Sequence, residues 1–245
     1  AMYFRDMKER GFVEWAERNG YAVPEFMLTD YALDAVAPMP PRKAWKEFSR
    51  LVPMTKDEFN NRLNGWDKKA FTVAGLENER VVMRVKQVIS EGLQKGELMK
   101  DVVARIDSIY DAAGVTSTSQ WHLETVYRTN VQSAVNAARY RELMDSRDSM
   151  SDFFPDLEYV TAGDDAVRDE HAALDGLIYP VDHPFWSVYY PPNGFNCRCM
   201  AIERTAIEKE RGAYEPRTDI PADIERPQDG FDRPPLELSE DIEVT

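Results

Sequence analysis

The stretch from Arg168 to Cys199 constrains the fold of this chain more than any other part. It contains both cysteines and two of the three histidines of the 245-residue sequence, interspersed with prolines and glycines that interrupt regular structure. We therefore expect a compact unit here that is rich in turns. Any special chemistry of the protein should start from this unit.

The chain before this stretch is predicted to be largely helical. Apolar residues recur at helical spacing over residues 77–92 and again over residues 98–110. Glycines punctuate these segments, and the longest helix is predicted over residues 121–144, where several alanines allow close packing. Thr55 and Glu58 have the spacing of a capping box, so a further helix should begin there.

Short β-prone runs over residues 157–161, 177–179 and 200–202 predict a small irregular sheet. The fold class is therefore α+β, with a mainly helical N-terminal region and a loop-rich β module. The predicted parts are an N-terminal arm over residues 1–38 that could dock on a partner, a helical region over residues 39–148, the module over residues 149–206, and an extended, acidic, proline-rich tail over residues 207–245.

Charge narrows the classes of function. The net charge is −14, and residues 207–245 hold twelve acidic and five basic residues. Sequence-independent binding of nucleic acid depends on basic side chains that release counterions from phosphates. We therefore do not expect direct DNA binding. No run approaches the roughly 18 apolar residues of a membrane span, and the first thirty residues lack the apolar core of a signal peptide. We expect synthesis in a reducing cytoplasm.

Cys197 and Cys199 leave three interpretations open. As thiolates they could bind Zn²⁺ together with His171, and His183, Asp182 or Asp175 could complete the tetrahedron. The cysteine spacing is tighter than is usual in zinc motifs. As a disulfide they would close a very small ring, which demands a bent backbone. As neither, they would be small buried apolar side chains beside a strand.

The other distinctive residues are expected to build turns and ion pairs. Asp175 should accept hydrogen bonds from its own backbone neighbours while Gly176 supplies a positive φ. Arg168 and Arg198 should pair with carboxylates, and phosphate binding is the functional alternative. The carboxylates considered are those of Asp164, Asp165 and Glu170.

Two further groups of side chains have structural explanations. On the longest predicted helix, Glu124, Arg128 and Asn130 are expected to form a polar seam toward the module, with the first two one turn apart and able to pair. The aromatic residues between the prolines are expected to form a small core rather than a base-stacking platform. They are Phe185, Trp186, Tyr189, Tyr190 and Phe195.

A longer pattern connects these residues. It consists of Arg168-Asp169-Glu170-His171, Leu174-Asp175-Gly176, Pro184-Phe185, Pro191-Pro192 and Asn196-Cys197-Arg198-Cys199. This run resembles the signature of the phage Mu F-like minor head proteins, the head morphogenesis family, and the resemblance covers roughly residues 40–211. By this resemblance, the structural motif consists of Arg168, Asp175, Gly176, Pro192, Asn196 and Arg198.

The resemblance implies a structural protein of a phage or prophage particle. Such a protein is made in the cytoplasm of the bacterial host and resides in few copies inside the capsid. It is associated with the portal, scaffold and capsid proteins and is needed for head assembly or for DNA packaging and ejection. No enzymatic activity is established for the motif.

An enzyme is the alternative hypothesis. A metal-dependent enzyme or toxin-like effector carried in the virion would use the clustered histidines, aspartates and cysteines as an open metal site. The sequence contains no complete catalytic motif, so we do not expect an enzyme. A DNA-binding packaging factor is the least favoured hypothesis because of the negative charge.

Overall fold

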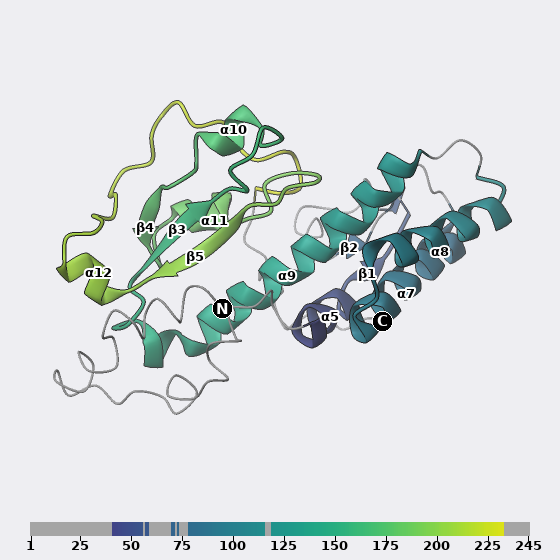
Figure 1. Ribbon diagram of the computed structural model, residues 1–245, viewed down its shortest axis with the longest axis horizontal. Coiled ribbons are helices and arrows are strands. Elements are labelled where there is room, and N and C mark those ends of the chain that lie inside the picture. Colours follow the sequence, from purple (N-terminus) through teal and green to yellow (C-terminus); the bar gives the residue numbers. More distant parts are fainter. Residues whose placement is uncertain are drawn as a thin grey trace.

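The structure is a computed structural model of the chain. Figure 1 shows a helical part and a part containing a small sheet, arranged along one long helix, α9 (Gln120–Met150). This is the α+β fold predicted from the sequence. The structure describes residues 41–55, 57–58, 70–71, 73, 78–115 and 119–232.

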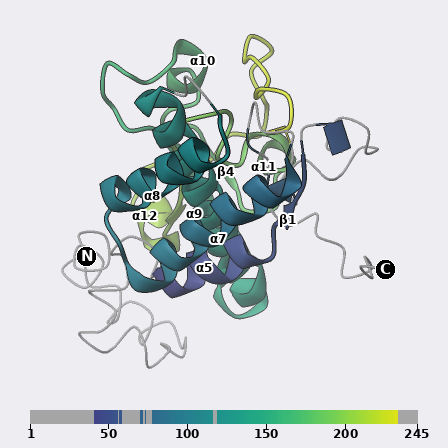
Figure 2. The same cartoon turned by 90° about the vertical axis from the view of Figure 1, so that its right-hand side faces the viewer.

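The helical part packs three helices against α9. Figure 2, which views the molecule from this end, shows them grouped in front of α9. A short parallel pair of strands adjoins α7, with Val52 opposite Ala70. The elements are α5 (Pro41–Ser49), β1 (Val52–Pro53), β2 (Ala70–Phe71), α7 (Glu79–Lys95) and α8 (Met99–Ala112).

Glycines set the boundaries and the packing of α7 and α8. Gly96 adopts a left-handed conformation with φ of 67° and ends α7. Gly92 was also expected to interrupt the helix, but α7 runs through it. A Cβ atom on Gly92 would lie 2.5 Å from Cγ2 of Val102 on α8, so the glycine lets the two helices approach closely.

Helix α9 connects the two parts. Ser119 caps its start by accepting a hydrogen bond from the backbone of His122, and the helix ends at Met150, six residues beyond the prediction. Leu123 near its start is buried in the core of the helical part. Tyr140 and Leu143 near its end pack against the core of the module. The additional residues also contact the module, because Arg147 forms an ion pair with Asp182 at 3.3 Å.

The module is built on a three-stranded antiparallel sheet in the order β4-β3-β5. In this sheet Leu157 lies opposite Tyr179 on one side and Glu203 on the other. The strands agree with the three runs predicted from the sequence, and the predicted aromatic core forms, except that Phe195 is exposed. The elements are β3 (Asp156–Val160), α10 (Asp169–Ala172), β4 (Ile178–Pro180), α11 (Phe185–Tyr189), β5 (Met200–Arg204) and α12 (Ala206–Glu210).

The segment after α12 packs on this module. The predicted tail begins inside α12, whose capping box joins Thr205 and Glu208. Beyond it the chain has no helix or strand as far as Asp232, but its backbone bonds to the module: Arg217 N donates to Ile178 O at 2.8 Å. The part of the tail that the structure describes is therefore not a free arm.

Three sequence predictions fall wholly or partly outside the described residues. The arm over residues 1–38 lies wholly outside them, and the predicted tail lies outside them from residue 233 onward. The capping box at Thr55 is present, since Thr55 N donates to Glu58 at 2.7 Å, but most of the helix expected after it is not described. None of the described helices is both long enough and apolar enough to cross a membrane.

Candidate functional site

His171, Cys197 and Cys199 form a buried cluster. His171 lies on the short helix α10, and the cysteines lie in the loop just before β5. One ligand-type atom from each residue lies within 4.8 Å of the others, and all three side chains are buried. The fold thus brings together the three residues that sequence reasoning proposed as metal ligands.

The guanidinium of Arg168 determines how this cluster is hydrogen-bonded. Its Nη2 atom lies 2.9 Å from Nε2 of His171. A guanidinium only donates, so Nε2 must be the acceptor and the ring proton must be on Nδ1. That Nδ1 atom lies 3.4 Å from Sγ of Cys199 and can donate to it.

The hydrogen bonds continue from Cys199 to Cys197. Both cysteines are free, so the disulfide interpretation is not the state that the structure shows. The hydrogen bond from Cys199, with smaller contributions from His171 and the backbone of Asn193, lowers the pKa of Cys197. The same bond and burial raise the pKa of Cys199. The donors therefore run from Arg168 through His171 and Cys199 to Cys197, which is the terminal acceptor.

Zinc is the metal that two thiolates and an imidazole would suit. For bond lengths of about 2.3 and 2.0 Å at a tetrahedral angle, sulfur and nitrogen ligands lie about 3.5 Å apart. The separation of 3.4 Å between Cys199 Sγ and His171 Nδ1 is close to that value. The donor types and this distance agree with zinc, but the remaining requirements are not met.

The proposed fourth ligands lie elsewhere. The ring of His183 stacks on Tyr179, and its Nδ1 accepts from the backbone of Phe185 at 3.1 Å. Asp182 is exposed and forms an ion pair with Arg147 at 3.3 Å. The prediction that one of them completes the tetrahedron does not agree with these positions, because each side chain is directed to another partner.

The surroundings of His171 also do not suit a metal ligand. A histidine that binds metal through one ring nitrogen normally donates its other N–H to a carboxylate or carbonyl. Here the other nitrogen faces a guanidinium, which is itself a donor. The residues present thus fit a hydrogen-bonded cluster and do not fit a closed zinc site.

Asp175 and Gly176 form the turn that leads into β4. Gly176 has a φ of 73°, as predicted, and its N–H donates to Tyr159 O at 2.8 Å. Asp175 does not bond its nearest backbone neighbours. Its carboxylate accepts from the backbone of Thr161 at 2.7 Å, which ties the turn to the end of β3.

The two motif arginines make the ion pairs that the sequence suggested. Arg198 donates through both terminal nitrogens to Asp164, each at 2.6 Å, and these bonds lower the pKa of that carboxyl. Arg168 pairs with Glu170 at 3.0 Å and also donates to Phe195 O at 3.0 Å. Both guanidiniums are used within the module, which favours the structural role over phosphate binding.

Asn196 joins the motif loop to α9. Its φ of 58° is left-handed, a conformation that asparagine tolerates better than most residues. Its N–H donates to Oγ1 of Thr129 at 3.0 Å, and its Nδ2 donates to Oγ1 of Thr125 at 3.2 Å. Pro192, which follows a cis peptide bond, is buried in the same loop.

Gln132 and Asn136 extend this contact, and sequence reasoning missed them. Their amides both donate to the carbonyl oxygen of Cys199, at 3.2 and 3.3 Å. The signal was present, because polar residues recur three or four apart on this face of α9. The seam predicted instead is directed elsewhere: Arg128 pairs with Glu124 at 3.2 Å, and the third residue bonds its own helix.

Comparison with known proteins agrees with this architecture. The model of a family described as "Phage Mu protein F like protein" matches residues 83–202, from α7 to β5. "Putative capsid assembly protein F" of Escherichia phage Mu is 30% identical over 193 residues, which cover 72% of this chain. "Mu-like prophage FluMu F protein" of Haemophilus influenzae is 28% identical over 191 residues, also 72% of the chain.

These relatives are much longer than the matched region. The match covers 43% of the phage Mu protein and 44% of the Haemophilus protein. No solved structure matches the chain. The family match includes the motif loop, the helices before it and the joint between them, and with both curated relatives it shows that the chain is a Mu F-like protein.

Proposed function

We propose that this protein acts in phage head morphogenesis, as a low-copy component inside the capsid that is associated with the portal. The observation that carries the proposal is the similarity to a protein named for capsid assembly, which extends over 72% of this chain. The match is not confined to one motif, because the family model includes both parts of the fold. A shared architecture of this extent supports a shared role in the head.

In this proposal the module is a rigid structural unit, and the helical part contacts portal, scaffold or capsid proteins. The motif side chains of the module are mostly used internally, in ion pairs and in hydrogen bonds to α9. The net charge of −14 supports recruitment by protein contacts rather than by DNA. In this proposal any role in packaging or ejection acts through other proteins and not through direct binding of DNA.

The alternative, an enzyme carried in the virion, has weaker support. A catalytic metal site keeps a position open to substrate. The cluster of His171, Cys197 and Cys199 is closed, since each side chain is at most 4% exposed. In the part of the chain that the structure describes, no other group of potential metal ligands comes together. We therefore propose a non-enzymatic role.

Quantitative mass spectrometry of purified heads tests the proposal. We expect a few copies per head relative to the portal and major capsid proteins, and loss of the protein from heads assembled without portal. A scaffold-deletion control separates loss of the portal from general failure of assembly. Absence from normal heads would overturn the proposal, and a copy number close to that of the major capsid protein would overturn the low-copy assignment.

A further inference from the structure

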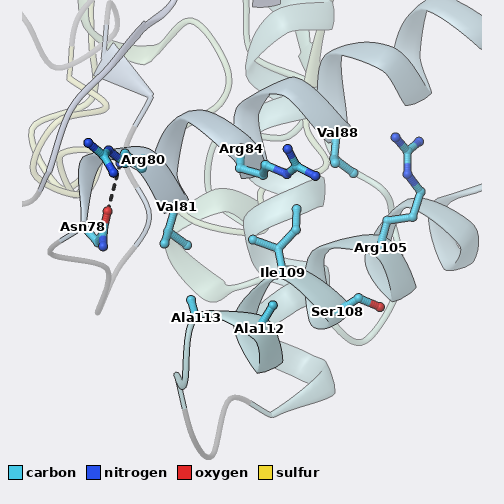
Figure 3. Close-up of a pocket in the computed structure, with 10 residues that line it drawn as sticks. All are labelled: Asn78, Arg80, Val81, Arg84, Val88, Arg105, Ser108, Ile109, Ala112 and Ala113. Carbon is cyan, nitrogen blue, oxygen red and sulfur yellow. Dashed lines mark hydrogen bonds between the residues drawn. The ribbon is translucent and has the colours of Figure 1, made fainter.

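An open groove lies between α7 and α8, outside the site described above. It has a volume of about 680 Å³ and is drawn in Figure 3. Its floor is apolar, with Val81 and Val88 from α7 and Ile109 from α8. The two valines are seven residues apart, so the floor extends for about two helical turns, or roughly 10 Å.

One end of this groove is fixed by an ion-pair bridge. Arg105 on α8 pairs with Glu91 on α7 and with Glu97 in the turn between the helices, the latter at 2.9 Å. The hydrogen bond that Arg105 donates to the carboxylate of Glu91 raises the pKa of the guanidinium, so Arg105 stays charged. The bridge links the two helices at the end of the groove where Gly92 also packs closely against Val102.

Two other arginines stand on the α7 side. Arg80 and Arg84 line the groove and are exposed, one turn apart on the helix (Figure 3). No ion pair joins either guanidinium to another of the described residues. Figure 3 shows the side chain of Arg84 extending over the floor above Ile109.

The positions of these arginines do not stabilise α7. Arg80 lies in the first turn, where a positive charge opposes the helix dipole. Arg80 and Arg84 have the i,i+4 spacing at which like charges repel and destabilise a helix. Local stability therefore does not explain the pair, whereas an anionic ligand in the groove would.

We propose that this groove binds an acidic amphipathic helix of a partner protein. Carboxylates on that helix would pair with Arg80 and Arg84, and its apolar side chains would rest on Val81 and Ile109. Ala112 lines the α8 side and leaves room for close approach of a third helix. Charge complementarity selects an acidic partner, and the apolar floor selects a folded peptide over a phosphate backbone.

Selection from a random 16-residue peptide library on the full-length protein tests this proposal. We expect enriched peptides with Asp or Glu at i and i+4 and apolar residues on the adjoining helical face. Arg80→Gln/Arg84→Gln should weaken their binding by about three- to tenfold, as expected for two exposed ion pairs. Lys95→Gln/Lys100→Gln is the matched control, because it removes two charges at the opposite end of α7 and α8.

Blocking the floor gives a second, independent variant. Ala112 is exposed, so Ala112→Trp should fill the groove without unfolding the bundle, and it should abolish peptide binding. Peptides without an acidic helical pattern, or equal binding to the arginine and lysine variants, would overturn the proposal. Binding of a 20-nucleotide duplex that requires Arg80 and Arg84 would overturn it in favour of nucleic acid. The peptide and duplex assays do not depend on any role in the head.

Discussion

At His171, the direction of each hydrogen bond, more than the identity of the residues, decides whether the cluster suits a zinc ion. The same three side chains would suggest zinc if the imidazole donated outward to an acceptor. Because Arg168 occupies that position at 2.9 Å, the imidazole donates inward to a sulfur. A positive guanidinium thus begins a chain of donors that ends on a cysteine of lowered pKa. Each ring nitrogen of His171 thus has a partner within the cluster without a metal.

This argument predicts that the module folds without zinc. We expect less than one tenth of an equivalent of zinc per chain by elemental analysis, and the same unfolding midpoint with and without a chelator. Cys197→Ser/Cys199→Ser should still destabilise the module by about 2 kcal/mol, because smaller and more polar hydroxyls replace two buried sulfur atoms. Met83→Ser on the exposed face of α7 is the control. One bound zinc, with loss of near-UV circular dichroism on chelation, would contradict the prediction.

Tyr110 provides a second prediction about a single residue. Its ring is buried in the helical core, and its hydroxyl has no hydrogen-bond partner among the described residues. Since an unpaired buried hydroxyl costs about 1–3 kcal/mol, Tyr110→Phe should raise the free energy of unfolding at pH 7 by about 1 kcal/mol. Urea denaturation of the two proteins measures the difference, and a loss of stability in the variant would contradict it.

The same tyrosine affects stability at high pH. Burial raises its pKa from 10.0 to about 12. The folded-state pKa lies above the unfolded value. The stability that the protonated hydroxyl contributes is therefore fully present below about pH 10 and is lost as the pH rises toward 12. Tyr110→Phe should therefore retain more of its stability than the parent between these pH values, as alkaline unfolding curves would show.

At the scale of elements, α9 holds the module through a shared acceptor. The carbonyl oxygen of Cys199 receives donors from both Gln132 and Asn136. If either donor is lost the carbonyl is still satisfied, but if both are lost it is buried without a partner. Gln132→Met and Asn136→Leu should each cost about 1 kcal/mol, and the double variant about 3 kcal/mol.

A double-mutant cycle by chemical denaturation measures this coupling. Arg128→Met/Asn130→Leu serves as the control pair and should be additive, because these side chains bond to Met99, Glu124 and the helix itself. Additive costs for Gln132 and Asn136 would show that the two amides do not share one acceptor in solution. In that case the joint between α9 and the module would depend on Asn196 and on the packing of Tyr140 and Leu143.

The elements also show what the sequence could predict. The helical period around Val85 and the three β-prone runs depend on local pattern, and these predictions are confirmed. The extra turn of α9 and the passage of α7 through Gly92 depend on contacts with distant residues, which local propensity cannot contain. The clustering of His171 with the cysteines was predicted, but the guanidinium beside it depends on side-chain geometry.

For the whole molecule, the described acidic segment after α12 is part of the fold. Tyr214 donates to Asp156 at 2.9 Å, and Asp156 is fully buried. Gln228 N donates to Asn193 O at 3.1 Å, and the ring of Phe231 packs on Phe195. Negative charge on this segment therefore does not keep it in solvent, because specific bonds anchor it at several points.

Deletion of residues 213–245 should consequently destabilise the module by about 3 kcal/mol, since several hydrogen bonds of about 0.5–1.5 kcal/mol are lost together. The buried carboxylate of Asp156 would retain Lys209 but lose Tyr214. Deletion of residues 233–245 is the matched control, because it removes acidic chain while all of these contacts remain. If both deletions shift the denaturation midpoint equally, charge repulsion rather than anchoring governs the segment. If only the longer deletion does so, the module extends to Asp232.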